Sequence, residues 1–189
     1  MAVVAIGVIV LGCWVGIVAR RARRTGANLT GSRHLLEVEL GRRYEQTDHL
    51  VTVARAAGLD PDAVTPLAGA RALALGLRAD AAPLADQAAA EDAITAALHR
   101  VTAGAAADPQ LRNDWTIQRP ILELQVTEQR LAGAARVYND QAAATDTLLR
   151  GTGTGPVARA LGVRAVSRFE ALPIELPADR AVNDEVAGG

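Results

Sequence analysis

The sequence predicts an all-α protein in which an N-terminal transmembrane helix is followed by an elongated antiparallel four-helix bundle. Three features lead to this fold class: an unbroken apolar run over residues 2–19, an alanine-rich composition, and Gly and Pro positions that divide the remainder into long helical stretches. Alanine is the best helix former. The alternation of β-branched and polar residues that marks strands is scarce. A sheet is therefore not expected.

The apolar run is long enough to cross a bilayer. Its 18 residues would rise about 27 Å as a helix, close to the roughly 30 Å of the hydrocarbon core. In lipid, a helix pairs all its own backbone groups. No basic residue precedes the run, and Arg20, Arg21, Arg23 and Arg24 follow it. The positive-inside bias predicts a single-pass plasma-membrane protein with its N-terminus outside and its helical domain in the cytoplasm.

Two other interpretations of this segment are less favoured. A signal peptide carries its positive charge before the apolar core, and the order here is reversed. The segment Val10-Leu11-Gly12-Cys13 loosely resembles a lipoprotein cleavage box, which leaves lipidation of Cys13 as an alternative. The bulky Leu11 and the missing basic segment count against it. A single cysteine excludes an internal disulfide framework. We predict a permanent anchor, with residues 2–19 in the lipid bilayer.

Residues 25–189 carry 16 Arg and 21 Asp or Glu, a net charge of −5. A nucleic-acid surface would be basic and would offer aromatic rings for base stacking, so no nucleic-acid partner is expected. The length suffices for one domain with its own core.

Stop and start signals divide this region into helices. Gly58, Gly104 and Gly151 can each end one. Asp60-Pro61 or Thr65-Pro66 can begin the second, as a cap followed by a first-turn proline, and Asp108-Pro109 and Gly155-Pro156 can begin the next two. The expected helices cover residues 29–57, 61–104, 108–150 and 156–171. Short connections make successive helices antiparallel.

Two prolines and the C-terminal stretch interrupt this pattern. Pro83 and Pro120 lie inside expected helices and should kink or interrupt them. Periodicity fades after Pro173, which predicts a disordered tail over residues 172–189.

Apolar residues alternate three and four positions apart, as in the buried seam of a helical bundle. The expected seam of the third helix is Ile117, Ile121, Leu124, Glu128, Leu131, Ala135, Tyr138, Ala142, Thr145 and Leu149. The second helix contributes Leu67, Ala70, Ala74, Leu77, Ala81, Leu84, Ala88, Ile94, Leu98 and Val101, and the first contributes Leu36, Leu40, Tyr44 and Val51.

Reactive constellations are not visible in the sequence. His34, His49 and His99 are scattered and are interpreted as helix histidines rather than metal ligands. The stretch 151–155 (Gly-Thr-Gly-Thr-Gly) lacks the residues of a phosphate loop and is interpreted as a flexible connector. The acids Asp60, Asp62, Glu91 and Asp92 read as surface residues. No catalytic, cofactor-binding or metal site is predicted.

Glu128 is the sharpest polar feature, because a charge on an apolar seam is costly unless it is paired. Its candidate partners are Arg42, Arg43 and Arg136, and the alternative is a seam thin enough for the carboxylate to reach water.

The stretch 138–140 (Tyr-Asn-Asp) is either a core ring beside exposed polar groups or a recognition spot. The Tyr138 ring is expected to pack near Tyr44 or Leu40. Asn139, about 100° off the seam, is expected to be dispensable for stability.

Several blocks together resemble the LemA family. They are Val38 to Val51, which contains Arg42-Arg43-Tyr44, then Ala70-Arg71-Ala72, Asp108-Pro109-Gln110-Leu111, Leu124-Gln125 with Glu128, Ala135-Arg136, Tyr138-Asn139-Asp140, Leu161-Gly162-Val163 and Arg168-Phe169-Glu170. Two positions depart from the family pattern: Asp48-His49 replaces Pro-Asn, and Thr145-Asp146 replaces Tyr-Asn.

The resemblance implies an N-terminal anchor with a small external end, followed by an antiparallel helical bundle. We expect the anchor and its basic flank to cover residues 1–24 and the LemA-like bundle to cover residues 25–171. It implies no catalytic residues, because the family has no established enzymatic activity.

Three functional hypotheses remain. The first is a membrane-tethered scaffold or interaction module with no catalytic activity, which binds a membrane-associated protein and is compatible with homo-oligomerisation. The second is an enzyme or enzyme accessory whose polar site forms only in the folded bundle. The third is a lipid-facing element in which Arg20 to Arg24 contact anionic headgroups, at about 1 kcal/mol per arginine. A deep pocket lined by Glu128 and arginines would favour an enzyme, and an apolar groove would favour a protein partner.

Overall fold

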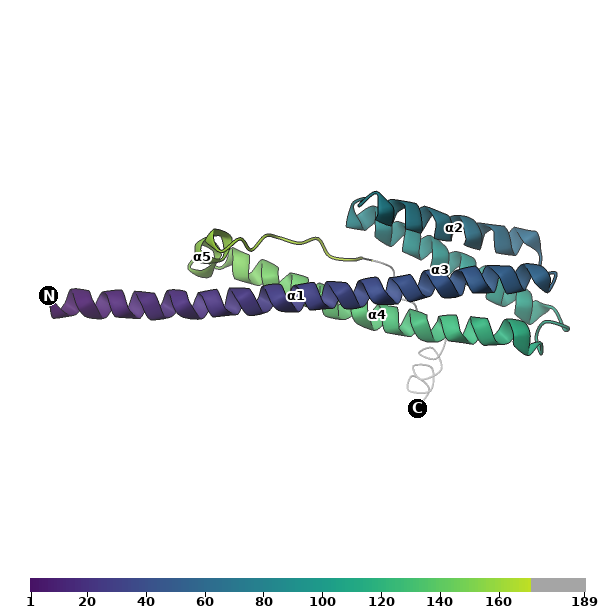
Figure 1. The fold of residues 1–189 in the computed structure, drawn as a ribbon, viewed down its shortest axis with the longest axis horizontal. Coiled ribbons are helices and arrows are strands. Elements are labelled where there is room, and N and C mark those ends of the chain that lie inside the picture. Colours follow the sequence, from purple (N-terminus) through teal and green to yellow (C-terminus); the bar gives the residue numbers. More distant parts are fainter. Residues whose placement is uncertain (171–189) are drawn as a thin grey trace, which may run out of the picture. The chain divides into compact units, whose positions relative to one another are not determined.

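The computed structural model describes residues 1–170, apart from the side chains of Ala2 and Val3, and this part of the chain contains five α-helices (Figure 1). The helices are α1 (Ala2–Ala56), α2 (Pro61–Ala79), α3 (Leu84–Ala107), α4 (Trp115–Arg150) and α5 (Thr154–Ala160). The all-α prediction is confirmed. The predicted disordered tail, residues 172–189, lies outside the described residues.

Helix α1 is continuous from Ala2 to Ala56, so the first predicted helix, 29–57, does not begin at residue 29 but is the second half of a longer helix. Glycine costs about 1 kcal/mol in a helix interior, and the Gly26 and Gly31 positions do not stop this helix. The helix ends where predicted. Gly58 adopts a φ of 77°, and the Leu59 amide donates to the Ala54 carbonyl at 3.0 Å, a Schellman cap that glycine accommodates without steric cost.

The second predicted helix, 61–104, is two helices. Its start is confirmed, because Asp60 caps α2 by accepting the Asp62 amide at 2.9 Å and Pro61 is the first helical residue. The chain then breaks at residues 80–83, where Ala81 has a φ of 49° and Pro83 precedes α3. Proline lacks the amide hydrogen that a continuous helix would need there.

The third predicted helix starts seven residues late, at Trp115 rather than at residue 108. Asp114 accepts the Thr116 amide at 2.8 Å and so caps α4, whereas Asp108 accepts the Gln110 amide in a preceding turn. Pro120 does not interrupt α4, which ends at Arg150 as predicted.

The fourth predicted helix, 156–171, is wrong in extent. Helix α5 covers only Thr154–Ala160, and Gly162 ends it with a φ of 83° while the Val163 amide donates to the Ala158 carbonyl at 3.0 Å. Residues 163–170 are not helical.

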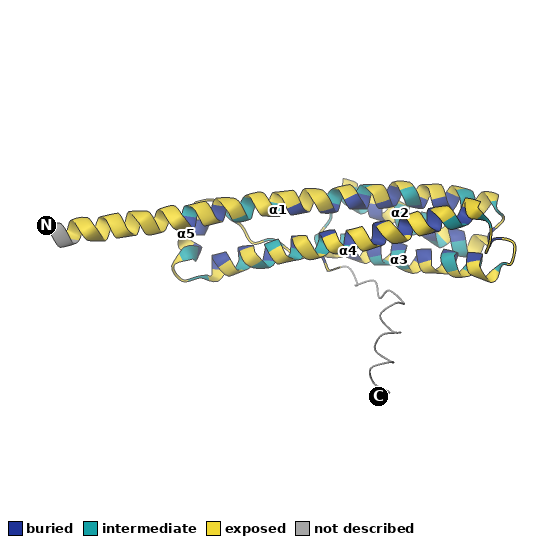
Figure 2. Cartoon of the chain, turned by 90° about the horizontal axis from the view of Figure 1, so that it is seen from below, coloured by how far each residue is buried: buried dark blue, intermediate teal, exposed yellow. Residues whose placement is uncertain are grey.

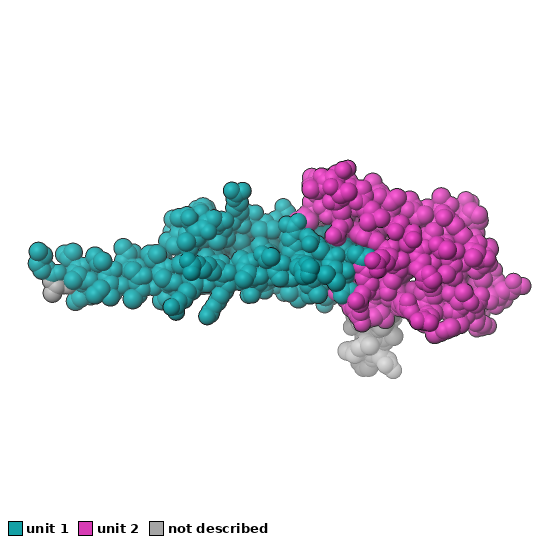
Figure 3. Space-filling view, viewed as in Figure 1, with its two compact units in different colours: residues 1–41, 133–169 teal, residues 42–132, 170–189 magenta. Residues whose placement is uncertain are grey.

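The described chain forms two compact units, coloured separately in Figure 3. The first consists of Met1–Gly41 and Gly133–Phe169, and Ala22, Leu148, Leu149 and Ala158 form a buried cluster in it. The second is built on Arg42–Ala132 and contains the end of α1, helices α2 and α3, and the start of α4. The second unit is therefore a four-helix arrangement, made from different helices than predicted.

The predicted seam is largely confirmed by burial. On α4 every predicted seam residue is buried except Ala135, which is half-buried. The predicted α1 residues Leu36, Leu40, Tyr44 and Val51 are all buried. The predicted seam of the second helix is only partly buried: Ala70, Leu77 and Leu84 are half-buried, and Ala81, at the helix break, is exposed.

Among the described residues, one helix is long and apolar enough to cross a membrane, and it is α1. Only 6 % of the most apolar 18-residue stretch of this helix is buried, and Figure 2 shows the N-terminal part of α1 as exposed. The large apolar side chains that are exposed there include Val4, Ile6, Val8, Ile9, Val10, Leu11, Trp14, Val15 and Ile17.

Candidate functional site

A buried arginine lies between two glutamates at the centre of the second unit. Arg43 of α1 is 1 % exposed, and its partners Glu91 of α3 and Glu128 of α4 are 2 % and 4 % exposed. The Arg43 Nη1 lies 2.6 Å from a Glu91 carboxylate oxygen, and its Nε lies 2.5 Å from a Glu128 carboxylate oxygen. One guanidinium thus joins three helices.

Hydroxyl groups complete this network. The Arg43 Nη2 donates to the Thr95 hydroxyl at 2.6 Å, and Nη1 also donates to the Glu91 backbone carbonyl at 3.2 Å. The Thr95 hydroxyl oxygen lies 3.2 Å from the Glu91 backbone carbonyl and 3.4 Å from a Glu128 carboxylate oxygen, and it can donate to either of them. The Tyr44 hydroxyl donates to the second Glu91 carboxylate oxygen. We refer to Arg43, Tyr44, Glu91, Thr95 and Glu128 as the Arg43 network.

The network has two carboxyl groups and one guanidinium, so full ionisation would leave an uncompensated negative charge. Burial raises the pKa of Glu128 above its ordinary value, although Arg43 and Thr95 act in the opposite direction. Burial and the Glu91 carboxylate also raise the pKa of Tyr44, which keeps this phenol a neutral donor. The raised pKa of Glu128 favours its neutral form and so opposes the charge excess.

The prediction that Glu128 needs a partner is confirmed, and of its three candidates Arg43 is the partner. Arg42 and Arg136 are exposed. The interpretation of Glu91 as a surface acid is wrong. The sequence contained a signal for it, because Glu91 continues the seam of Ile94, Leu98 and Val101 at the same three-four spacing.

Helix α2 is attached to the same part of α1 through Arg71. Its Nε donates to the Tyr44 backbone carbonyl at 2.8 Å, and its Nη1 lies 3.1 Å from the Asp48 carboxylate. The Arg78 guanidinium lies 5.7 Å from the centre of the Tyr44 ring, a cation–π distance. Asp48, one of the departures from the family pattern, therefore has a partner on α2.

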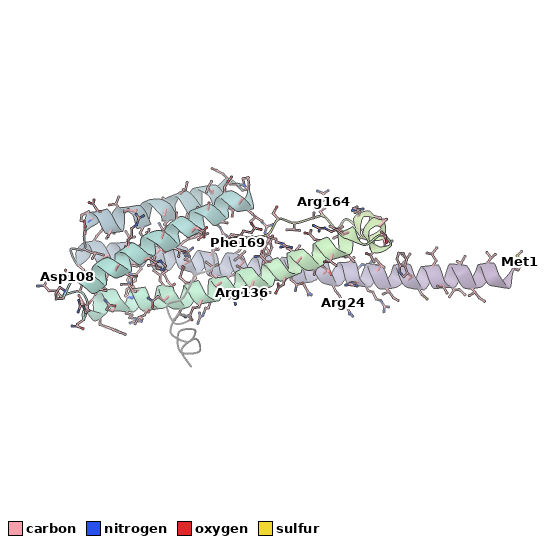
Figure 4. All side chains as sticks on the ribbon, turned by 180° about the vertical axis from the view of Figure 1, so that it is seen from behind. Met1, Arg24, Asp108, Arg136, Arg164 and Phe169 are labelled. Carbon is pink, nitrogen blue, oxygen red and sulfur yellow. The ribbon has the colours of Figure 1, made fainter. Side chains whose placement is uncertain are left out.

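A second polar cluster lies in the first unit, where α4 holds the chain after α5. The Tyr138 hydroxyl donates to the Ser167 carbonyl at 2.9 Å. The Asn139 amide donates to the Phe169 carbonyl at 2.9 Å and accepts the Phe169 amide at 2.8 Å. Figure 4 labels Phe169 and Arg164 on this segment.

The expected burial of Tyr138 is confirmed, and burial raises its pKa while Arg33 of α1 partly opposes that rise. The structure argues against the expectation that Asn139 is dispensable for stability, because its side chain pairs with the backbone amide and carbonyl of Phe169, which lies outside any helix. The seam argument considered helices alone and could not anticipate an extended segment on α4.

The other residues considered as possible ligands in the sequence lie in simpler environments. His34, His49 and His99 are exposed residues of α1 and α3. Of residues 151–155, only 151–153 connect α4 to α5, because Thr154 and Gly155 are the first residues of α5; the Gly155 amide donates to the Gly151 carbonyl at 2.7 Å. No group of three metal-ligating side chains occurs within residues 1–170.

An apolar groove lies on the exposed face of α4 in the second unit. A cavity of about 400 Å³ is lined by Gln46, Trp115, Arg119, Leu122, Glu123, Val126, Thr127 and Arg130. Trp115, Leu122 and Val126 are exposed despite their size. The Gln46 side-chain oxygen is buried here without a hydrogen-bond donor among the described residues. We call these residues the α4 groove.

Fold and site define an all-α helical-bundle protein with one long apolar N-terminal helix and a buried charge network. The LemA family model matches residues 33–182, most of the chain, and the protein therefore belongs to the LemA family. No curated protein gives a significant match to the sequence. Arg43, Tyr44 and Glu128 of the Arg43 network all fall in blocks through which the sequence resembles this family.

Proposed function

We propose that this protein is a single-pass, membrane-anchored interaction module with no catalytic activity of its own. The observation that carries the proposal is the α4 groove. A soluble bundle normally buries large apolar side chains, and an exposed apolar strip with polar flanks is typical of a surface that binds another protein. The bilayer would hold residues 2–19.

The α4 groove fits an amphipathic helix of a membrane-associated partner. Trp115, Leu122 and Val126 are spaced seven and four residues apart, so they form one strip along a helix. Such strips receive partner residues at helical spacing. Arg119, Glu123 and Arg130 supply a charged rim, and the unsatisfied Gln46 oxygen offers an acceptor to a partner's donor.

An enzyme is the alternative, and the Arg43 network is the place to look for it. Its charged groups are buried and directed at one another, which leaves them ill placed to reach a substrate. They are well placed to hold α1, α3 and α4 together. This arrangement supports the non-catalytic function over the enzyme.

Proximity labelling from the full-length protein in cells tests the proposal. Leu122→Glu places a charge in the α4 groove, and Leu73→Glu on α2 is a matched control, since the two leucines are 47 % and 55 % exposed. We expect Leu122→Glu to remove specific neighbours from the labelling profile, and Leu73→Glu to retain them. Loss of only the protein's own peptides would identify a second copy as the occupant. Unchanged profiles in both variants would refute the role of the groove.

The proposed orientation can be tested with single cysteines. Cys13 is the only cysteine in the sequence, so Cys13→Ser provides a clean background for Thr52→Cys on the exposed face of α1. With the helical domain in the cytoplasm, a membrane-impermeant maleimide should label Thr52→Cys only after the cells are lysed. Labelling of intact cells would contradict the orientation.

A further inference from the structure

The first unit has a strongly basic composition. Residues 1–41 and 133–169 contain 10 Arg and 4 acidic residues, whereas residues 42–132 contain 9 Arg and 12 acidic residues. Nine of the 10 arginines lie in residues 1–36 and 147–169, which contain no Asp or Glu. The positive charge therefore accompanies the apolar helix and the chain around α5.

Helix α5 packs close to the end of the apolar run. Ala22 of α1 shares a buried cluster with Leu148, Leu149 and Ala158. A Cβ added to Gly153, in the turn before α5, would lie 3.0 Å from the Trp14 ring. If residues 2–19 cross a bilayer, Trp14 lies five residues, or about 7.5 Å along the helix, inside the end of the span, so this turn reaches the outer part of the hydrocarbon below the headgroups.

The turn between α4 and α5 satisfies its backbone in a way that suits such a position. The last carbonyls of a helix lack partners within that helix and normally bond to water. Here the Thr154 hydroxyl donates to the Leu148 carbonyl at 2.9 Å, and the Arg159 Nη2 donates to the Leu149 carbonyl at 3.1 Å. Because these carbonyls have hydrogen-bond partners within the protein, moving the turn out of water costs less free energy.

Beside α5 lies a cavity of about 540 Å³, within the usual size of a ligand pocket. Its lining includes Arg23 and Gly26 of α1, and Leu161, Val163 and Arg164 of the segment after α5. Arg23 and Arg164 are both exposed, and neither has an ion-pair partner among the described residues. Two free guanidinium groups beside apolar walls match a phosphate attached to lipid.

The position of Arg23 along α1 fits this ligand. It lies four residues beyond the expected end of the bilayer span, or about 6 Å along the helix. The headgroup layer is about 5–8 Å thick on each side of the hydrocarbon core. Arg23, and the cavity that it shares with Arg164, therefore fall at headgroup depth.

We infer that the cavity between Arg23 and Arg164 binds the phosphate of an anionic phospholipid, with α5 and the preceding turn resting in the membrane interface. This inference rests on the proposed membrane anchor. It adds a specific lipid site to a segment that would otherwise serve only as a tether.

Native mass spectrometry of the full-length protein in neutral detergent can measure this binding. Phosphatidylglycerol and phosphatidylcholine with identical acyl chains are offered at equal concentration. The variants are Arg23→Gln, Arg164→Gln and the double variant. The control is Arg136→Gln, an exposed arginine on α4 in the same unit, labelled in Figure 4, that does not line the cavity. Circular dichroism confirms that each variant keeps its helical content.

We expect phosphatidylglycerol to bind preferentially. Each single cavity variant should weaken its binding about fivefold, and the double variant about 25-fold. The control should behave as the unaltered protein, and millimolar inorganic phosphate should not displace the lipid. Equal binding of the two lipids, or an equal effect of Arg136→Gln, would overturn the site. Displacement by inorganic phosphate would replace it with a site for soluble anions.

Flotation with phosphatidylcholine vesicles separates this inference from the proposed anchor. Protein that floats with vesicles but shows no lipid preference contradicts the lipid site alone. Protein that stays at the bottom of the gradient contradicts the anchor as well.

Discussion

The two compact units both contain parts of α1 and α4, but they differ in which other segments are present and in how polar side chains hold those segments. In the first, the chain after α5 lies on α4, where Tyr138 and Asn139 bind its backbone. In the second, helices α2 and α3 are present, and the Arg43 network joins side chains of three helices. An extended segment offers unpaired backbone groups, so neutral polar side chains hold it. Along a helix the amides are already paired with carbonyls, so α1, α3 and α4 are joined mainly between side chains, and Arg43 and Arg71 add bonds to helix carbonyls.

Breaking the Arg43 network should give the largest effect. Arg43→Leu leaves Glu91 and Glu128 buried without their cation, and removing one partner of a buried ion pair costs about 3–5 kcal/mol. Arg42→Leu, at the exposed neighbouring position, should change stability by about 0.5 kcal/mol or less. Denaturant unfolding followed by Trp115 fluorescence, in a Trp14→Phe background, measures both. Similar effects of the two variants would mean that the network does not stabilise the second unit.

Breaking the Asn139 contact should give a smaller and local effect. Asn139→Ala removes both hydrogen bonds to Phe169, and a net loss of about 1–2 kcal/mol is expected for polar groups left unpaired. Hydrogen–deuterium exchange at the Phe169 amide should accelerate about tenfold. The adjacent exposed Asp140 provides a control, since Asp140→Ala should leave this exchange unchanged. Unaltered exchange in Asn139→Ala would show that the side chain does not hold this segment.

The pH dependence of the second unit should give the smallest effect. Burial raises the folded-state pKa of Glu128 above its ordinary value of 4.5, against the opposing effects of Arg43 and Thr95 and with a small contribution from Glu91. The folded protein then binds a proton more tightly than the unfolded chain. The stability linked to this carboxyl is fully present below about pH 4.5 and falls as the pH rises through the folded-state pKa.

Glu128→Gln should therefore remove part of the decline in stability above pH 4.5, at most about 1.4 kcal/mol for each pH unit. Glu123→Gln, at an exposed glutamate of the same helix, should leave the profile unchanged. Melting temperatures measured across pH 4–8 provide the test. A Glu128→Gln profile parallel to that of the unaltered protein would contradict the raised pKa.

Features that depend on helical periodicity, or on capping and stop residues at helix ends, were predictable from the sequence. The seam of α4, the cap at Asp60 and the glycine stops at Gly58 and Gly151 are all present in the structure. Helix boundaries were less predictable where two caps compete. Asp108 and Asp114 are both good caps, and the sequence alone does not reveal that only the second starts α4.

The polar partners were only partly predictable. Glu128 stood out because the residues around it on the seam are large and apolar, whereas Glu91 follows a run of alanines that hides the seam position. The role of Asn139 depends on Phe169, 30 residues further along the chain and outside any regular element. Periodicity within a helix carries no information about such a segment.

The central claim is that the Arg43 network holds helices together rather than performing chemistry or recognition. Replacing a buried ion network with apolar residues of similar volume is often neutral or stabilising. The combined variant Arg43→Met, Glu91→Leu and Glu128→Leu should keep the melting temperature, within a few degrees or higher, and the full proximity-labelling profile of the unaltered protein. A variant that folds with an unchanged melting temperature but loses that profile would contradict the claim, because the charges would then serve a function beyond stability.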